Sequence, residues 1–394
     1  MGYRRLGKAG RVYLEEGSET IVRKISKIIF DCDGVLLSVN KSYREAIRKT
    51  VDHYFKKILR LKGEGGLVTR FDIQRFKDTG HYNNDWQLSH SLVAFYLAIL
   101  FRKLHERSAL SGFMEEFGEL QFDNVENFTA KLSKIGDYCS QQGIGVQHLL
   151  SLKANKVLGI ASFLEKFSNV EEALGQILPY PNSDQVALIQ KLVPYNSQGD
   201  DLLKRLFEEI YLGGSLFSRF YGISPFFKFK KGLIEKEQLI PSKKTLSLLN
   251  ARLGKFGVYS ERPRSQGLYV IEQMGVTRYF DEKALYFYDD LAQFAGRGCD
   301  AAPKKTGKPD PSEFIALADK MLGTVDVGAY VGDTVSDVLL VRNAREKGLE
   351  NIAFIGTLSS SSRRRELFSK YEMYAADAII MDANDLPFLL EKLS

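Results

Sequence analysis

Residues 27–36, KIIFDCDGVL, decide the fold of this chain. Residues 27–30 form a short aliphatic run that predicts a buried strand, and this run leads directly into the acidic loop DCDG at residues 31–34. From residue 42 to residue 61 the apolar side chains are spaced as on one face of a helix. The stretch therefore predicts a strand, an acidic loop and a helix in succession.

The sequence that follows shows two different patterns of apolar residues. Up to about residue 221 the apolar spacing stays helical, and the clearer helices are expected at residues 85–105, 124–134, 147–167, 184–192 and 200–220. After Pro241 strands and helices alternate, with strands expected at residues 256–259, 284–288, 328–331, 352–355 and 378–381. Such alternation predicts a parallel sheet covered by helices on both faces, with ligands beyond the carboxyl ends of the strands.

The position of the helical block predicts the domain organisation. One strand of the sheet precedes the block and the others follow it, so the block is expected to be an insertion. We predict an α/β fold with a Rossmann-like parallel sheet as its core and a large inserted all-α cap. The core comprises residues 27–38 and 242–394, and the cap comprises residues 39–241. Residues 1–26 form an N-terminal extension, in which residues 11–14 and 20–23 are expected to be the arms of an edge hairpin.

Composition and charge argue against several classes of protein. Hydrophobic residues make up 44% of the chain and charged residues 26%, as in ordinary globular proteins. The formal charge of 55 − 49 = +6 is scattered and interleaved with acids, which favours a solvated surface over nucleic-acid binding. The longest apolar run, residues 92–101, is about half as long as a bilayer span requires, so no membrane association is expected.

The N-terminus and the cysteines indicate a cytoplasmic protein. The first residues mix basic and acidic side chains and lack an apolar segment with a cleavage site, so no export signal is expected. Cys32, Cys139 and Cys299 are far apart and form no C-x-x-C pair, which implies neither a disulfide framework nor a zinc site.

Chemistry is indicated by four short signals that follow one another along the chain. They are D-x-D-G at Asp31, Asp33 and Gly34, Ser260 after a strand, Lys308 before Pro309, and G-D-x-x-x-D at Gly332, Asp333 and Asp337. Each signal alone is weak. D-x-D-G also occurs in ordinary turns, and an isolated lysine is usually solvated. A calcium loop is not supported, because Val35, Leu36 and Leu37 stand where oxygen ligands would be needed.

Together the four signals resemble those of the haloacid dehalogenase superfamily, whose phosphatases carry D-x-D-G-V/L, a Ser or Thr, a K-P-D-P-like lysine and G-D-x-x-x-D in this order. The matching stretches are FDCDGVL at 30–36, VYSERPRS at 258–265, GKPDPSEF at 307–314 and YVGDTVSD at 330–337. A helical cap between the first two signals resembles the branch that includes phosphoglycolate phosphatase. The resemblance of the expected core covers about half of the chain.

The resemblance implies a role for each core residue. Asp31 is implied to be the nucleophile, which forms an aspartyl-phosphate intermediate. Asp33 is implied to protonate the leaving oxygen and then to activate water. Ser260 and Lys308 are implied to contact the phosphoryl oxygens. Because dehalogenation needs no leaving-group acid, the presence of Asp33 favours ester hydrolysis or phosphomutase chemistry.

A divalent cation is also implied, because two carboxylates beside a phosphate dianion would repel it. Mg²⁺ prefers hard oxygen ligands and keeps several waters. By the resemblance, the carboxylates of Asp31 and Asp333 and the main-chain carbonyl of Asp33 supply three ligand positions. Asp337 is implied to steady the metal shell or its waters.

Candidate substrate residues lie in the cap and beside the second signal. Asn83, Asn84 and Trp86 belong to a polar, aromatic turn before a helix, where they either contact substrate or cap that helix. Arg262 and Arg264 either clamp a second anionic group of the substrate or anchor their own loop through carboxylates.

The favoured function is a Mg²⁺-dependent phosphatase that hydrolyses a small organic phosphate monoester through an aspartyl-phosphate. Two alternatives stay open. A sugar-phosphate mutase would transfer the phosphoryl group instead of releasing phosphate. A catalytically silent module of the same fold would only bind a phosphorylated ligand, although the chain retains every catalytic residue type that the signals require.

Overall fold

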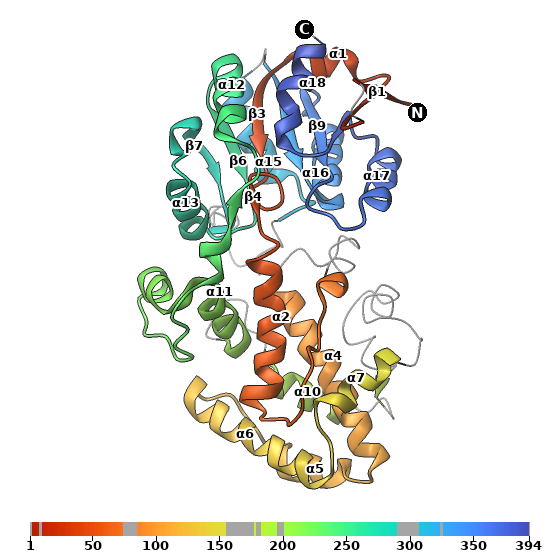
Figure 1. The fold of residues 1–394 in the computed structure, drawn as a ribbon, viewed down its shortest axis with the longest axis vertical. Coiled ribbons are helices and arrows are strands. Elements are labelled where there is room, and N and C mark those ends of the chain that lie inside the picture. The colour runs from red at the N-terminus through yellow and green to blue at the C-terminus, as the bar shows by residue number, and fades with distance from the viewer. Residues whose placement is uncertain are drawn as a thin grey trace. The chain divides into compact units, whose positions relative to one another are not determined.

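The computed structural model describes residues 2–7, 10–73, 85–154, 177–178, 183–194, 201–289, 307–323 and 326–393 (Figure 1). Contacts divide the chain into two compact units. The core unit consists of Met1–Asn40 and Glu237–Ser394, and the cap unit of Lys41–Lys236. The chain therefore leaves the core unit after its first part and returns to it at Glu237.

The core unit is built on an eight-stranded sheet in the order β1-β2-β10-β9-β8-β3-β6-β7. The six strands from β10 to β7 run parallel, and β2 and β1 extend the sheet antiparallel beside β10. Strand β3 lies in the middle, between β8 and β6. The bounds are β1 Tyr3–Leu6, β2 Val12–Glu15, β3 Ile25–Phe30, β6 Phe256–Tyr259, β7 Phe280–Tyr286, β8 Val327–Gly332, β9 Ile352–Thr357 and β10 Ala378–Ile380. The predicted α/β fold class, a Rossmann-like sheet with a helical insertion, is confirmed.

Helices cover the sheet because its strands carry apolar side chains on both faces. Ile29 of β3 packs in one cluster with Phe314 of α15 and Tyr371 of α17. Phe30, the next residue, points to the opposite face and packs edge-on against Phe256, with ring centroids 5.3 Å apart. The core helices are α1 Glu19–Arg23, α12 Lys243–Leu253, α13 Arg264–Gln273, α15 Ser312–Leu322, α16 Val335–Glu346, α17 Arg364–Met373 and α18 Leu386–Lys392, with short 3₁₀ turns at Thr277–Tyr279 and Ala383–Asp385. Burial on both faces explains why the central strand reads as a continuous apolar run.

One arm of the predicted N-terminal hairpin is wrong. Residues 11–14 largely coincide with β2, but residues 20–23 belong to helix α1, and the second arm is β1. The β-branched residues Thr20, Ile21 and Val22 favour a strand by local propensity. However, β2 already pairs with β1 on one side and with β10 on the other, so it has no edge left for another strand. The segment instead forms a helical turn that buries Val22.

The two passages of the chain between the units are paired with each other. Strand β4 (Leu37–Ser38) pairs antiparallel with β5 (Gln238–Leu239), and Ile240 N donates a further hydrogen bond to Leu36 O over 2.8 Å. The outgoing and returning segments are therefore held side by side directly after the acidic loop.

The described residues of the cap unit form helices joined by loops and no strand. Its elements are α2 Tyr43–His53 with a π-helical continuation Tyr54–Ile58, α4 Asp85–Glu106, α5 Leu110–Phe117, α6 Val125–Gln141, α7 Val146–Ala154, α10 Ser183–Leu192, α11 Leu202–Tyr221 and a 3₁₀ turn Leu233–Lys236. Helix α5 was not predicted, and the part of the predicted helix 147–167 beyond residue 154 lies outside the described residues. The apolar run at residues 92–101 lies in α4, where most of its side chains are buried. None of the described helices is both long and apolar enough to cross a membrane.

His53, at the end of α2, is half-buried beside aromatic side chains. Its ring packs edge-on against Phe227 and Phe229, with centroid distances of 5.4 and 5.5 Å. Burial, helped by the nearby charge of Lys57, lowers the pKa of His53 from 6.5 to about 4. The folded cap unit therefore holds this ring neutral at pH values where an unfolded chain would protonate it.

We expect acid to destabilise the native protein more than a His53→Gln variant. Below pH 6.5 the unfolded chain takes up a proton that folded His53 accepts only near pH 4, so stability is lost across this window. The difference should reach on the order of 1–3 kcal/mol near pH 4. Urea unfolding of both proteins above and within the window measures it, and parallel pH profiles would contradict the expected cause.

Candidate functional site

Three adjacent parallel strands bring the predicted core residues to one edge of the sheet. Asp31 follows the end of β3, Ser260 follows β6 and Asp333 follows β8. Parallel strands that are neighbours end at the same edge, so the residues that follow them converge. Asp31 N donates to Val331 O over 2.9 Å, which extends the pairing of β3 and β8 into the acidic loop.

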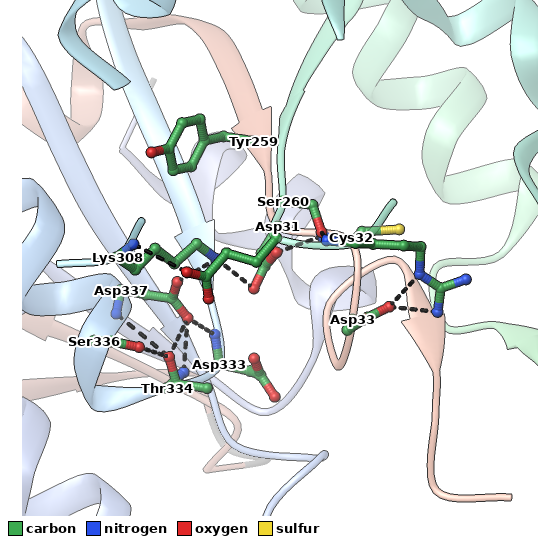
Figure 2. A network of polar contacts seen from close by, with 12 residues as sticks. Asp31, Cys32, Asp33, Tyr259, Ser260, Lys308, Asp333, Thr334, Ser336 and Asp337 are labelled. Atoms are coloured by element: carbon green, nitrogen blue, oxygen red, sulfur yellow. Dashed lines mark hydrogen bonds and ion pairs between the residues drawn. The ribbon is translucent and has the colours of Figure 1, made fainter. Parts of the chain in front are cut away.

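Lys308 lies between two buried carboxylates (Figure 2). Its Nζ is 2.8 Å from Asp31 Oδ2 and 2.7 Å from Asp337 Oδ1. The rings of Tyr330 and Tyr259 flank the ammonium, with centroids 5.5 and 6.0 Å away. The side chain of Lys308 is only 4% exposed, so the lysine is part of the site's interior and not a solvated surface residue.

Burial and charge act against each other in this cluster. Burial raises the pKa of Asp31 well above its ordinary value, the ammonium of Lys308 opposes that rise, and the carboxylates of Asp337 and Asp333 add to it. For Lys308, burial disfavours the charged form, but Asp31 and Asp337 outweigh it and raise the pKa. The lysine is therefore held as a cation, while the carboxylates have an excess of negative charge that a further cation would offset.

Asp337 organises the loop after β8. Its Oδ2 accepts hydrogen bonds from Asp333 N (3.0 Å), Thr334 N (2.9 Å) and Thr334 Oγ1 (2.7 Å), which caps the start of α16. Its Oδ1 accepts from Lys308 and from the Tyr330 hydroxyl, 3.2 Å away. Because both oxygens are already occupied, this carboxylate is suited to orienting its neighbours more than to binding a metal directly.

Three carboxylates lie close enough to share a metal ion. Asp31, Asp333 and Asp337 each have an oxygen within 4.8 Å of the others. Gly34 makes room for Asp333, because a Cβ at this position would lie 1.9 Å from Asp333 Oδ2. Gly34 also has a φ of +81°, a conformation that favours glycine. The cluster, made of hard oxygen donors in a confined space, fits a small divalent cation.

Asp33 belongs to a second polar group on the same loop. Its Oδ1 accepts from Arg262 Nε over 2.9 Å and from Arg262 Nη2 over 2.6 Å. Arg262 is bound on its other side by Glu237, with Nη1 2.9 Å from Oε2 and Nη2 3.0 Å from Oε1. The side chains of Arg262 and Glu237 are fully buried. Figure 2 shows Asp33 apart from the cluster formed by Asp31, Lys308 and Asp337.

The candidates for substrate binding are engaged within the protein where the structure describes them. Arg262 holds Asp33 and Glu237, and Arg264 donates from Nη1 to Leu285 O over 3.0 Å. These contacts agree with the alternative in which the two arginines anchor protein groups. Ser260 is 2% exposed, and its Oγ accepts from Arg262 N over 3.3 Å.

In the cap unit, Trp86 Nε1 donates to Glu208 Oε1 over 2.8 Å. Lys204 Nζ lies 4.5 Å from the centroid of the Trp86 ring. The indole therefore has partners within its own unit. Asn83 and Asn84 lie outside the described residues.

Sequence reasoning missed Glu237. It lies where the chain returns to the core unit and belongs to none of the four signals. Its partner Arg262 is 25 positions further along the chain, so no local spacing connects the two.

Comparison with known proteins shows a shared fold. No family model matches the chain. A protein solved by X-ray crystallography as a target of the Northeast Structural Genomics Consortium has a TM-score of 0.63 at 21% identity, over 94% of this chain and 99% of its own. A phosphatase from Thermococcus thioreducens has a TM-score of 0.44 at 20% identity, over 93% of this chain and 98% of its own. At 21% identity, the similarity to the first of these structures describes the fold alone.

One curated protein shares a short segment. An imidazoleglycerol-phosphate dehydratase from Phytophthora nicotianae is 41% identical over 69 residues. This match spans 18% of the present chain and only 13% of that protein.

We expect a Gly34→Ala substitution to disrupt the carboxylate cluster. The new methyl group would displace Asp333 and strain the backbone, so binding of divalent cations should weaken and the free energy of unfolding should fall. Gly222→Ala is the matched control, because Gly222 has a φ of +70° and nothing within 4 Å of an added Cβ. The control should lose about 1–2 kcal/mol through backbone strain alone. Calorimetric Mg²⁺ titration and urea unfolding test this, and unchanged affinity in Gly34→Ala would refute it.

Proposed function

We propose that this chain, which has the haloacid dehalogenase fold, is a Mg²⁺-dependent phosphatase that hydrolyses a small organic phosphate monoester. The observation that supports this most strongly is the arrangement of Asp31. Its carboxylate lies beside the buried ammonium of Lys308 and within reach of Asp333 and Asp337, and a second carboxylate, Asp33, follows two residues later. A nucleophile, a cation, a candidate metal site and a candidate proton donor thus occur in one short loop and its neighbours.

The residues that would hold Mg²⁺ are Asp31 and Asp333 through their carboxylates and Asp33 through its main-chain carbonyl. Asp337 would keep Asp333 and Lys308 in place. When bound, the ion supplies positive charge that offsets the repulsion between these carboxylates and a phosphate dianion.

In the first half-reaction, a carboxylate oxygen of Asp31 attacks the phosphorus atom. A bond forms between this oxygen and phosphorus while the bond between phosphorus and the ester oxygen breaks. Lys308 offsets negative charge on the phosphoryl oxygens, and Ser260 donates a hydrogen bond to one of them. Asp33 transfers its proton to the departing ester oxygen, so that an alcohol leaves and not an alkoxide.

In the second half-reaction, Asp33 takes a proton from a water molecule. The oxygen of that water attacks phosphorus, the bond between Asp31 and phosphorus breaks, and inorganic phosphate is released. Asp33 is then protonated again and Asp31 is again a carboxylate. One acid therefore serves both half-reactions and no other reactant is consumed.

We expect the native protein to release inorganic phosphate from at least one member of a panel of phosphate monoesters in the presence of Mg²⁺. EDTA should abolish the release, and Asp31→Asn should reduce it by several orders of magnitude because the amide is a poor nucleophile. Asp319→Asn is the control, since Asp319 is an exposed aspartate on α15 and should retain native activity.

If the folded, Mg²⁺-binding protein releases no phosphate from any ester, the proposed phosphatase activity is overturned. Transfer of the phosphoryl group to a second sugar phosphate, without release, would instead indicate the mutase. Chromatographic analysis of the same reactions distinguishes the two outcomes.

A further inference from the structure

The proposed acid Asp33 accepts hydrogen bonds from the buried Arg262, and Arg262 in turn donates to the buried Glu237. Two donors of Arg262, Nε and Nη2, converge on the same oxygen of Asp33, and two donors, Nη1 and Nη2, bind the two oxygens of Glu237. We propose that Arg262 is a positioning residue for Asp33, and that Glu237 is the residue that fixes Arg262. This inference rests on the proposed phosphatase function.

Asp33 needs such a partner more than Asp31 does. The side chain of Asp33 is 31% exposed, whereas that of Asp31 is 8% exposed and is already fixed by Lys308 and by Cys32 N. A short, partly exposed carboxylate on a loop samples several rotamers unless a partner selects one. The guanidinium is planar and rigid, so its two donors together fix the position of Oδ1 and thereby select one rotamer of the Asp33 side chain.

The geometry also distinguishes the two oxygens of Asp33. Oδ1 accepts both hydrogen bonds from Arg262, whereas Oδ2 accepts none from any residue that the structure describes. The arrangement therefore assigns Oδ1 to orientation and Oδ2 to proton transfer. In the first half-reaction Oδ2 gives its proton to the ester oxygen as the bond between that oxygen and phosphorus breaks.

Glu237 makes this arrangement possible in a buried place. Its carboxylate offsets the formal charge of Arg262, and the side chains of both residues are completely buried. An arginine without this partner would leave buried donors unsatisfied, which is costly and would free the guanidinium to turn. Glu237 thus acts on Asp33 through Arg262, which binds both carboxylates.

A positioning role differs from a substrate clamp in its dependence on the leaving group. Departure of an alkoxide requires a proton from Asp33, whereas p-nitrophenolate leaves readily without one. The value of kcat/KM reports only the steps up to departure of the leaving group, so the later use of Asp33 as a base does not enter it. Loss of positioning should therefore lower kcat/KM for ethyl phosphate much more than for p-nitrophenyl phosphate.

The experiment compares five proteins on these two esters. Asp33→Asn gives the loss expected when the acid is absent. It should lower kcat/KM for ethyl phosphate by about 10²–10⁴-fold, with a smaller loss for the aryl ester. The double variant Arg262→Met/Glu237→Met removes both buried charges together, which preserves volume and avoids leaving one of them unpaired. It should lose about 10–100-fold on ethyl phosphate and about threefold or less on the aryl ester.

Two further variants complete the comparison. Arg262→Lys keeps the charge but not the fork, and should restore part of the activity on ethyl phosphate. Arg278→Gln is the matched control, because Arg278 is an exposed arginine that precedes β7 in the core unit and its Nη2 donates to the Tyr279 hydroxyl over 2.8 Å. It should behave as the native protein on both esters. Thermal unfolding and Mg²⁺ affinity near the native values show that each protein is folded with its metal site intact.

The outcomes separate the inference from the function on which it rests. An equal loss on both esters in the double variant, with an unequal loss in Asp33→Asn, overturns the positioning role alone. An equal loss of kcat/KM on both esters in Asp33→Asn overturns the acid role of Asp33 and the inference with it. A native protein that hydrolyses neither these esters nor any of the wider panel overturns the proposed function itself.

Discussion

The contact on which the site depends is the ammonium of Lys308 between the carboxylates of Asp31 and Asp337. Burying carboxylates so close together costs free energy, because they repel each other and lose hydration. The lysine compensates part of that cost, and it connects the loop before α15 to those that follow β3 and β8. Asp337 in turn fixes the backbone that carries Asp333. Removal of the lysine would therefore disturb all three segments, and not only a single contact with phosphate.

The acidic loop joins two polar networks that are built on different cations. Asp31 is bound by Lys308, and Asp33, two residues later, is bound by Arg262. The proposed nucleophile and the proposed acid are thus oriented by different cations, which lie on different loops. Each side chain can keep its own direction, although the two residues are near neighbours in the sequence. Gly34 completes the loop by leaving the space that Asp333 occupies.

The architecture of the core unit was predictable because its signals are local. Buried parallel strands read as apolar runs, and the residues that follow their carboxyl ends share an edge, so Asp31, Ser260 and Asp333 could be grouped from sequence alone. The N-terminal arm at residues 20–23 was mispredicted because strand pairing, which is non-local, overrides β propensity. Arg262 could be identified as an anion-binding residue, but sequence does not tell whether its anion belongs to a ligand or to the protein. Glu237 gave no signal because its role exists only through contact with Arg262.

The pairing of β4 with β5 has a consequence for how such a chain can change over time. The two ends of the helical insertion leave and re-enter the core unit through one short antiparallel ladder. Exchange or growth of the inserted segment therefore leaves the order and register of the sheet strands untouched, since only the distance between two neighbouring attachment points must be kept. A lineage could thus replace the inserted unit and acquire new recognition properties while inheriting the same reactive loop.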